Sequence, residues 1–234
     1  GRVPRSDWSH IGSSAMSHSG PIARDVRDAA TMMSVLAGWD GRDLFCLPEE
    51  APDYLGSIDK GANGMRLVWT DDFGHGDTFM TPESTRVVDT VKRAAQGLRG
   101  LGVEIEETKA GFGDPFAAGS RIMLGDAGLA IYQKLSREDV AFAREERARL
   151  WEAYRRVLAD NNFIISATTP HVAPTREDWA TAWGVPEAGK MPAHMGHYTP
   201  YTAAANVLGW PAISLPAGFV DGLPVGFQLI GKPD

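Results

Sequence analysis

The chain has a single cysteine, Cys46, among 234 residues, so it can form no internal disulfide and no site with two thiolate ligands. It has no apolar run close to the roughly 20 residues that cross a bilayer. Its first ten residues, GRVPRSDWSH, have no apolar core of the kind found in signal peptides. From these absences we expect a cytoplasmic protein with no membrane partner.

Basic residues are also scarce: 23 Lys and Arg stand against 30 Asp and Glu, for a formal net charge of -7. No basic stretch with interleaved aromatics occurs, so we expect no nucleic-acid partner. Glycine-rich phosphate loops are absent, and no cofactor is expected. His194 and His197 are the closest approach to a metal motif, but no cysteine or carboxylate lies near, and Pro192 and Gly196 disfavour a helix, so we expect no metal.

Hydrophobic residues make up 43% of the chain, enough for a sizeable core. Apolar residues at helical spacing predict a helix over residues 24–37. Met65–Trp69 reads as a strand, Thr81-Pro82-Glu83 begins a second helix, and Val103–Glu107 reads as the next strand. Strand, helix and strand in this order predict a crossover that pairs the two strands in parallel.

The second half continues the alternation. Ser136 and Asp139 begin a helix that extends to Ala159, and Phe163–Ala167 is a short buried strand. A short helix near 201–208 and two strands, 212–215 and 225–230, follow. The pattern predicts an α/β fold: a three-layer α/β/α sandwich around a mixed, largely parallel sheet that is incomplete here.

The last strand, 225–230, has no helix after it to cover it. An exposed terminal strand would be a liability, so we expect the chain to be cut short at its carboxyl end. We expect Ile213 and Leu215, in the strand before it, to point into the core. An Asp221-Gly222 turn joins these two strands.

Three stretches together carry a family resemblance. They are SGPIARDVRDAATMMSVLAGWDGRD (19–43), FIISATTPHVAP (163–174) and YTAAANVLGWPAISLPAGFVDGLPVGFQLIGKP (201–233). In this order they resemble the amidase signature family, serine amidohydrolases with a Ser-Ser-Lys triad. In that family the catalytic lysine and the Gly/Ser-rich loop with both serines lie upstream of the GPIAR stretch.

The resemblance therefore implies that residues 1–234 are a single partial domain, the carboxyl-side portion of an amidase. It implies that this chain carries no catalytic residue of the triad and is inactive by itself. It also implies the reaction of the complete enzyme, which is hydrolysis of a carboxamide to a carboxylic acid and ammonia or an amine.

The loop GSSAMSHSG is the local alternative for a nucleophile, but it lacks the G-x-S-x-G spacing. Loop serines more often satisfy turns and the amides of a following helix. By the resemblance, Ser17, His18 and Ser19 lie beside the active site and line the substrate pocket without catalysis. The resemblance also implies that Asp28 orients an arginine of the upstream loop, the alternative being a solvated helix face with local ion pairs.

Residues 168–200 read as a long loop, and such loops often carry function. By the resemblance, His171, Trp179, Trp183 and Tyr198 shape the acyl pocket for a small-molecule amide. The alternative is a surface loop anchored by its tryptophans.

Two other functions stay open. The chain could be a non-catalytic half that binds a ligand, a complementary upstream segment or a second copy of itself. It could also belong to an amidotransferase that acts on aminoacyl-tRNA, although the acidic composition disfavours this.

Overall fold

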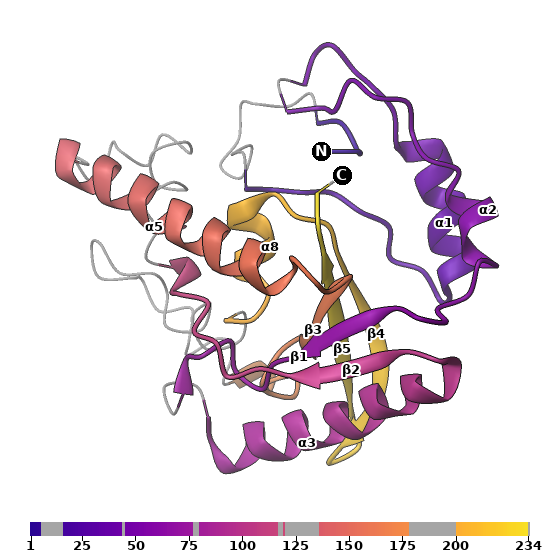
Figure 1. The fold of residues 1–234 in the computed structure, drawn as a ribbon, viewed down its shortest axis with the longest axis vertical. Coiled ribbons are helices and arrows are strands. Elements are labelled where there is room, and N and C mark those ends of the chain that lie inside the picture. The colour runs from indigo at the N-terminus through magenta and orange to yellow at the C-terminus, as the bar shows by residue number, and fades with distance from the viewer. Residues whose placement is uncertain are drawn as a thin grey trace.

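The computed structural model describes residues 1–5, 16–43, 45–76, 80–116, 119, 136–177 and 200–233. Its centre is a five-stranded sheet in the order β2-β1-β3-β5-β4 (Figure 1). The strands are β1 (Arg66–Trp69), β2 (Glu104–Glu107), β3 (Phe163–Ala167), β4 (Ala212–Val220) and β5 (Leu223–Gly231). β1 pairs in parallel with β2 and β3, whereas β5 is antiparallel to both β3 and β4. The expected mixed sheet is confirmed, with parallel and antiparallel pairings in equal number.

Helix α3 (Pro82–Gln96) covers one face of this sheet. Thr81 and Ser84 form a reciprocal capping box at its start. Val87, Val91 and Ala95 recur at helical spacing and are buried against the strands. The 3-10 helix η2 (Gly97–Leu101) continues α3 and leads back into β2, so the predicted parallel crossover is confirmed.

Helices α5 (Arg137–Val157) and α8 (Ala203–Leu208) lie on the other side of the sheet from α3 (Figure 1). α5 begins at the expected capping box of Ser136 and Asp139. Its Tyr154 ring stacks 6.1 Å from Phe73 and meets Trp210 edge to face at 5.7 Å, which places aromatic rings between α5 and the sheet.

Helices α1 (Val26–Leu36) and α2 (Tyr54–Ile58) pack against each other and stand apart from the sheet (Figure 1). No element was predicted for the stretch that contains α2, since five residues are too few for a clear apolar period. The first residues join this layer: the Gly38 amide donates to the Arg2 carbonyl at 3.1 Å.

The last strand does not lie at an edge of the sheet. The tight turn at Asp221-Gly222 folds β5 back between β3 and β4, so Ile230 of β5 is fully buried. The edge strands of the described sheet are β2 and β4, and Ile213 of β4 is 41% exposed rather than in the core. Leu215 is only half-buried.

Both final strands are also longer than expected, because the hairpin pairing extends them to the turn. In the described part of the chain, no helix is both long and apolar enough to span a membrane.

Candidate functional site

The segments that follow β1 and β3 meet at one edge of the sheet. The two strands are parallel and adjacent, so their carboxyl ends lie side by side, and this is the edge where α/β sheets usually bind ligands. The Thr70 amide donates to the Ile165 carbonyl at 3.1 Å and extends the pairing beyond β1. The loop 168–172 after β3 and the loop 70–76 after β1 therefore form the candidate site.

Glu83, in the first turn of α3, holds the loop after β3. Its Oε1 accepts the Val172 amide at 3.0 Å and lies 3.9 Å from Nδ1 of His171. The His171 side chain is 2% exposed, and the Glu83 side chain 39%. The His171 side chain is thus buried beneath the surface of this loop, so the structure does not place it on an open pocket rim.

Gln228 of β5 ties three segments together from a buried position. Its Nε2 donates to Ser166 Oγ at 3.0 Å, to the Tyr201 carbonyl at 2.8 Å and to the Ala167 carbonyl at 3.4 Å. Tyr201 precedes α8, so this one amide group joins β5, β3 and the approach to α8. Burial, and then the charges of Asp72 and Asp71, raise the pKa of the Tyr201 hydroxyl above its usual range, which keeps it protonated.

A pair of hydroxyls joins the end of β3 to β4. Thr168 Oγ1 and Ser214 Oγ are 2.7 Å apart, and Ser214 is exposed on β4. A Cβ atom at Gly226 would lie within 3.3 Å of both hydroxyl oxygens. The absence of a side chain at this glycine therefore leaves room for the two hydroxyls to contact each other. A threonine hydroxyl is no general base, and this contact does not activate Ser214 as a nucleophile.

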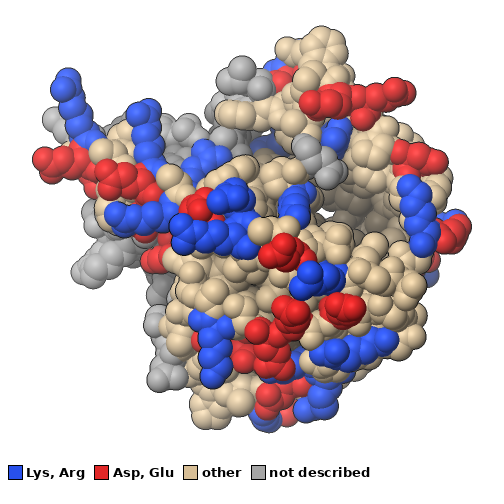
Figure 2. Space-filling model, viewed as in Figure 1, with Lys and Arg blue, Asp and Glu red and all other residues tan. Residues whose placement is uncertain are grey.

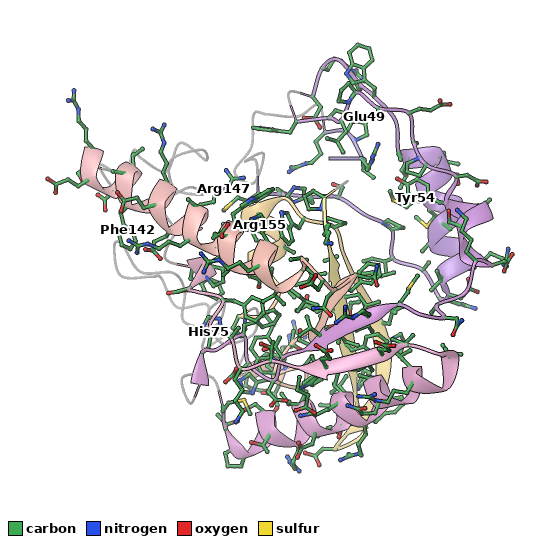
Figure 3. All side chains as sticks on the ribbon, viewed as in Figure 1. Glu49, Tyr54, His75, Phe142, Arg147 and Arg155 are labelled. Carbon is green, nitrogen blue, oxygen red and sulfur yellow. The ribbon has the colours of Figure 1, made fainter. Side chains whose placement is uncertain are left out.

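Asp72 organises the loop after β1. Its two carboxylate oxygens accept the amides of Gly74 and Gly76 at 2.8 and 3.0 Å. His75 lies between these glycines, beyond the end of β1 (Figure 3). Burial lowers the pKa of His75, while the nearby carboxylates of Asp114 and Asp72 oppose this shift, so the imidazole is favoured in its neutral form.

Ser17, His18 and Ser19 lie in the extended segment before α1. Ser17 is half-buried and its carbonyl accepts Arg5 Nη1 at 3.1 Å, whereas His18 and Ser19 are exposed. Partial burial, followed by the amino-group charge of Gly1, lowers the pKa of His18. Their role as pocket residues stays a prediction.

Met16, the residue before Ser17, connects this segment to helix α8. Asn206 Nδ2 of α8 donates to the Met16 carbonyl at 2.7 Å. The segment with Ser17 and helix α8 are therefore neighbours.

Asp28 is exposed at the third position of α1, where its amide donates to the Asp25 carboxylate at 2.8 Å. Its neighbour Arg27 pairs with Asp59 of the α1–α2 layer at 3.1 Å. Asp28 does not belong to that pair, and its proposed contact with an upstream arginine stays a prediction.

Trp179, Trp183 and Tyr198 lie outside the described residues, as does the pair His194 and His197. Among the residues that the structure does describe, no group of three or more His, Cys, Asp or Glu is placed to hold a metal ion.

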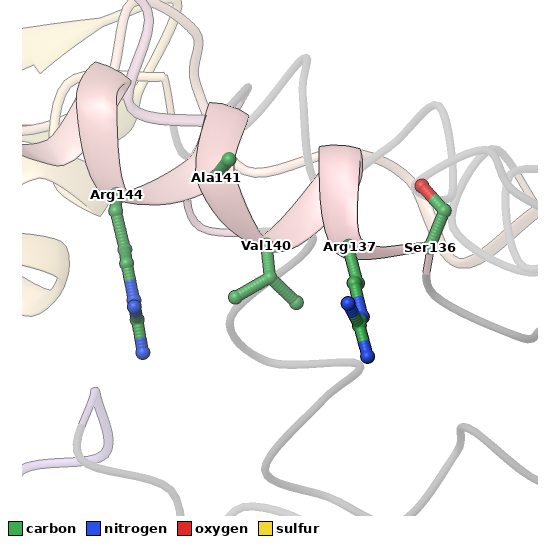
Figure 4. A pocket seen from close by; sticks show the side chains of 5 residues that line it. All are labelled: Ser136, Arg137, Val140, Ala141 and Arg144. Atoms are coloured by element: carbon green, nitrogen blue, oxygen red, sulfur yellow. The ribbon is translucent and has the colours of Figure 1, made fainter.

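A surface hollow borders helix α5, away from these loops. Ser136, Arg137, Val140, Ala141 and Arg144 line this shallow depression of about 340 Å³ (Figure 4). One helix face with two arginines and no nucleophile–base pair does not form an active site.

Sequence reasoning missed Glu83, Gln228 and the Thr168–Ser214 pair. The signal for Gln228 was present: one amide side chain interrupts an otherwise apolar final strand, and a buried polar group needs partners. No sequence signal pointed to Glu83, whose partner in the loop after β3 lies 89 positions away.

Comparisons with known proteins place this geometry in a family. The sequence profile described as Amidase matches residues 1–112 and 110–234, which together span the chain. A glutamyl-tRNA(Gln) amidotransferase subunit of Heliobacterium modesticaldum is 28% identical over 267 residues, covering 94% of this chain and 52% of that protein. The same subunit of Pseudomonas aeruginosa is 29% identical, covering 98% of this chain and 54% of its own length.

Solved structures agree on the fold. A bacterial aryl acylamidase of the amidase signature family superposes with a TM-score of 0.76 at 22% identity, over 99% of this chain and 53% of that one. A 6-aminohexanoate cyclic dimer hydrolase, complexed with substrate, gives 0.74 at 25% identity, over 98% and 55%. This chain thus spans about half the length of the relatives that it matches, and it belongs to the amidase signature family.

Proposed function

We propose that this chain forms the substrate-pocket half of an amide-hydrolysing enzyme. The observation that carries the proposal is the family match over the whole chain, combined with two loops that converge at the carboxyl edge of parallel strands. That edge is where a small-molecule amide would lie.

In the reaction, a serine oxygen attacks the carboxamide carbon, and the C–N bond breaks as the leaving nitrogen takes a proton. An acyl-enzyme ester forms, and water then releases the carboxylic acid. The family's serines and lysine would perform these steps, and they correspond to no motif in this chain. Binding and orientation of the acyl group fall to this half.

The loop 168–172 is the best-supported contributor from the described residues. Glu83 fixes its course through the Val172 amide, and Thr168 bonds across to β4. Ser17, His18 and Ser19 would approach from the segment that Asn206 anchors through Met16. Trp179, Trp183 and Tyr198 would complete the acyl pocket, with Asp28 supporting the loop that holds the triad.

The test is labelling with a fluorophosphonate, which reacts with activated serines, read by intact mass. The chain alone is compared with a fusion in which the unmatched upstream part of the Heliobacterium relative precedes Gly1. We expect one adduct on the fusion and none on the chain alone. An adduct on the chain alone would contradict the proposal and make the serines around Ser17 the first candidates.

An amidotransferase role is the second candidate. The observation in its favour is that relatives of about 28% identity are named as glutamyl-tRNA(Gln) amidotransferase subunits. We expected no nucleic-acid partner for this chain because of its net charge and its lack of a basic stretch. That expectation is not supported, because the names of these relatives refer to a tRNA. Hydrolysis of glutamine by the unlabelled fusion, with no turnover of aryl amides, would favour this role; the reverse preference would favour the hydrolase.

A further inference from the structure

The loop 168–172 is held at both ends by its backbone amides, and the two acceptors differ in kind. At the first end, the Thr168 amide donates to the Gly226 carbonyl at 2.9 Å and continues the pairing of β3 with β5. At the second end, the Val172 amide donates at 3.0 Å to Oε1 of Glu83, a side chain of α3. A backbone carbonyl stays in place when a side chain is changed, so only the second amide bond depends on the identity of a side chain.

Between its two ends the loop is stiff. Thr169 Oγ1 donates to the His171 carbonyl at 3.0 Å and closes a local turn. Pro170, inside this turn, has a fixed φ angle and is buried, and the His171 side chain is buried as well. A short, stiff segment moves as a unit, so the bonds at its two ends decide which way its surface faces.

Glu83 projects from a well-anchored helix start. It is the second residue of α3, after Pro82, and Thr81 and Ser84 form the capping box on either side. Ser84 is fully buried, and α3 packs against β3 and β4. Glu83 also lies in the first turn of the helix, where the helix dipole favours negative charge. The oxygen that accepts the Val172 amide is therefore fixed in place by the fold.

Glu83 differs from other acidic side chains on this part of the surface. Acidic and basic residues intermingle over the face that carries β2 and α3 (Figure 2). Glu107 of β2, for example, accepts Lys92 Nζ at 2.8 Å. Within the described residues, Glu83 forms no ion pair with a lysine or arginine, and its carboxylate is directed at the Val172 amide and the His171 ring instead. A carboxylate that accepts the backbone amide of a neighbouring loop holds that loop more strongly than a neutral acceptor does.

We propose that Glu83 is a positioning residue for the acyl pocket. By holding Val172, it fixes the loop 168–172 as a preformed surface against which the acyl group of the amide binds. This inference rests on the proposed function, because it assigns the loop to the acyl side of the substrate. A surface that is ordered before the substrate arrives lowers the entropic cost of binding. Loss of Glu83 therefore weakens binding and discrimination between acyl groups rather than cleavage of the C–N bond.

Hydrogen–deuterium exchange on the chain, read by mass spectrometry on a peptide covering 168–173, tests the hold on the loop. Glu83→Ala removes the acceptor, and we expect the peptide to exchange at least ~10-fold faster than in the original chain. Glu83→Gln keeps an acceptor oxygen on a side chain of the same length, and we expect it to restore exchange to within ~3-fold. Unchanged exchange in Glu83→Ala, or equal acceleration in both variants, would overturn the proposal.

The matched control is Glu138→Ala. Glu138 is the second residue of α5, as Glu83 is of α3, so both carboxylates have the same place relative to a helix dipole. Glu138 is exposed and, unlike Glu83, accepts no amide from another described segment. We expect Glu138→Ala to leave the exchange of 168–173 unchanged. Equal acceleration by the two alanine variants would mean that the contact with Val172 is not what protects the loop, and the proposal would be wrong.

Kinetics of the fusion with the upstream part of the Heliobacterium relative test the role in binding. The substrates are the p-nitroanilides of acetic, butyric and benzoic acid, which differ only in the acyl group. We expect Glu83→Ala to raise the KM of the best substrate ~5-fold or more, to change kcat by less than ~3-fold and to narrow the differences in kcat/KM among the three. Glu83→Gln should recover the KM of the parent fusion. A fall in kcat at unchanged KM would overturn the proposal.

Fluorophosphonate labelling separates this proposal from the proposed function. A parent fusion that takes no label and hydrolyses no amide rejects the proposed function, and the assignment of the loop to the acyl group falls with it. A labelled, active fusion in which Glu83→Ala changes neither KM nor the exchange of the loop rejects only the positioning role.

Discussion

Substitution of Gln228 by leucine tests the buried amide network that joins β5, β3 and the approach to α8. The change keeps a similar volume but removes the donor to the Tyr201 carbonyl, at 2.8 Å, and to Ser166 Oγ, at 3.0 Å. Each buried acceptor left without a donor costs ~1–3 kcal/mol. Ser166 keeps its own bond to the Ala167 carbonyl, and leucine regains part of the loss by apolar transfer.

We therefore expect Gln228→Leu to lower the free energy of unfolding by about 2–4 kcal/mol. The assay is urea unfolding followed by circular dichroism. Gln96→Leu, at the partly exposed end of α3, is the matched control and should stay within ~0.5 kcal/mol of the original chain. A double-mutant cycle with Ser166→Ala then measures the coupling between the two side chains.

The isosteric change Gln228→Glu sharpens the test through pH. At neutral pH a buried carboxylate would face the Tyr201 carbonyl with no proton to donate, so we expect a larger loss than for leucine. Burial would raise the folded-state pKa of this carboxyl above its unfolded value. The folded state then binds more protons, and stability should recover as pH falls toward the unfolded pKa.

Unchanged stability for Gln228→Leu would refute the reasoning, because it would mean that the amide contributes no net stabilisation to the junction. A Gln228→Glu variant whose stability does not depend on pH beyond that of the original chain would refute the burial argument in particular.

Packing, backbone geometry and titration give three more predictions. Leu158→Ala, at a fully buried site, should cost ~2–5 kcal/mol in urea unfolding, against less than ~0.5 kcal/mol for exposed Leu101→Ala; equal values would contradict the packing described for the end of α5. Gly74→Ala should lower the Tm more than Gly76→Ala, because both have positive φ but only the Gly74 methyl would meet backbone, at 2.5 Å from Gly111 Cα; the reverse order would refute this. His75 has a folded-state pKa lowered by burial, so the unfolded state binds more protons and stability should fall as pH drops below about 6.5; His75→Gln should flatten the stability–pH curve in that window, and an unchanged curve would argue against the titration.

Much of the fold follows from local chemistry in the sequence. Thr81-Pro82-Glu83 and Ser136 with Asp139 marked the starts of α3 and α5, because caps act within a few residues. Strand β3 was predicted at its observed bounds, since a short apolar run between polar segments is typical of a buried strand. Family membership was also predicted from three stretches of the sequence, and the profile match over residues 1–112 and 110–234 confirms it.

The sheet edge and the site depended on contacts between distant residues. The hairpin turn at Asp221-Gly222 was predicted from the sequence, but the order of the two strands that it joins was not. Burial across the whole sheet decides whether β5 or β4 lies beside β3. β5 takes the inner place because its Ile230 and Gln228 find buried partners there. His171 is likewise enclosed by Glu83 across 88 positions of sequence, a contact with no local period or motif.

The sequence by itself thus determined most of the elements, the caps of α3 and α5, and the family, since these depend on neighbours along the chain. Only the tertiary structure decided which strand stays open and which polar groups meet, since these depend on how the completed elements share buried surface.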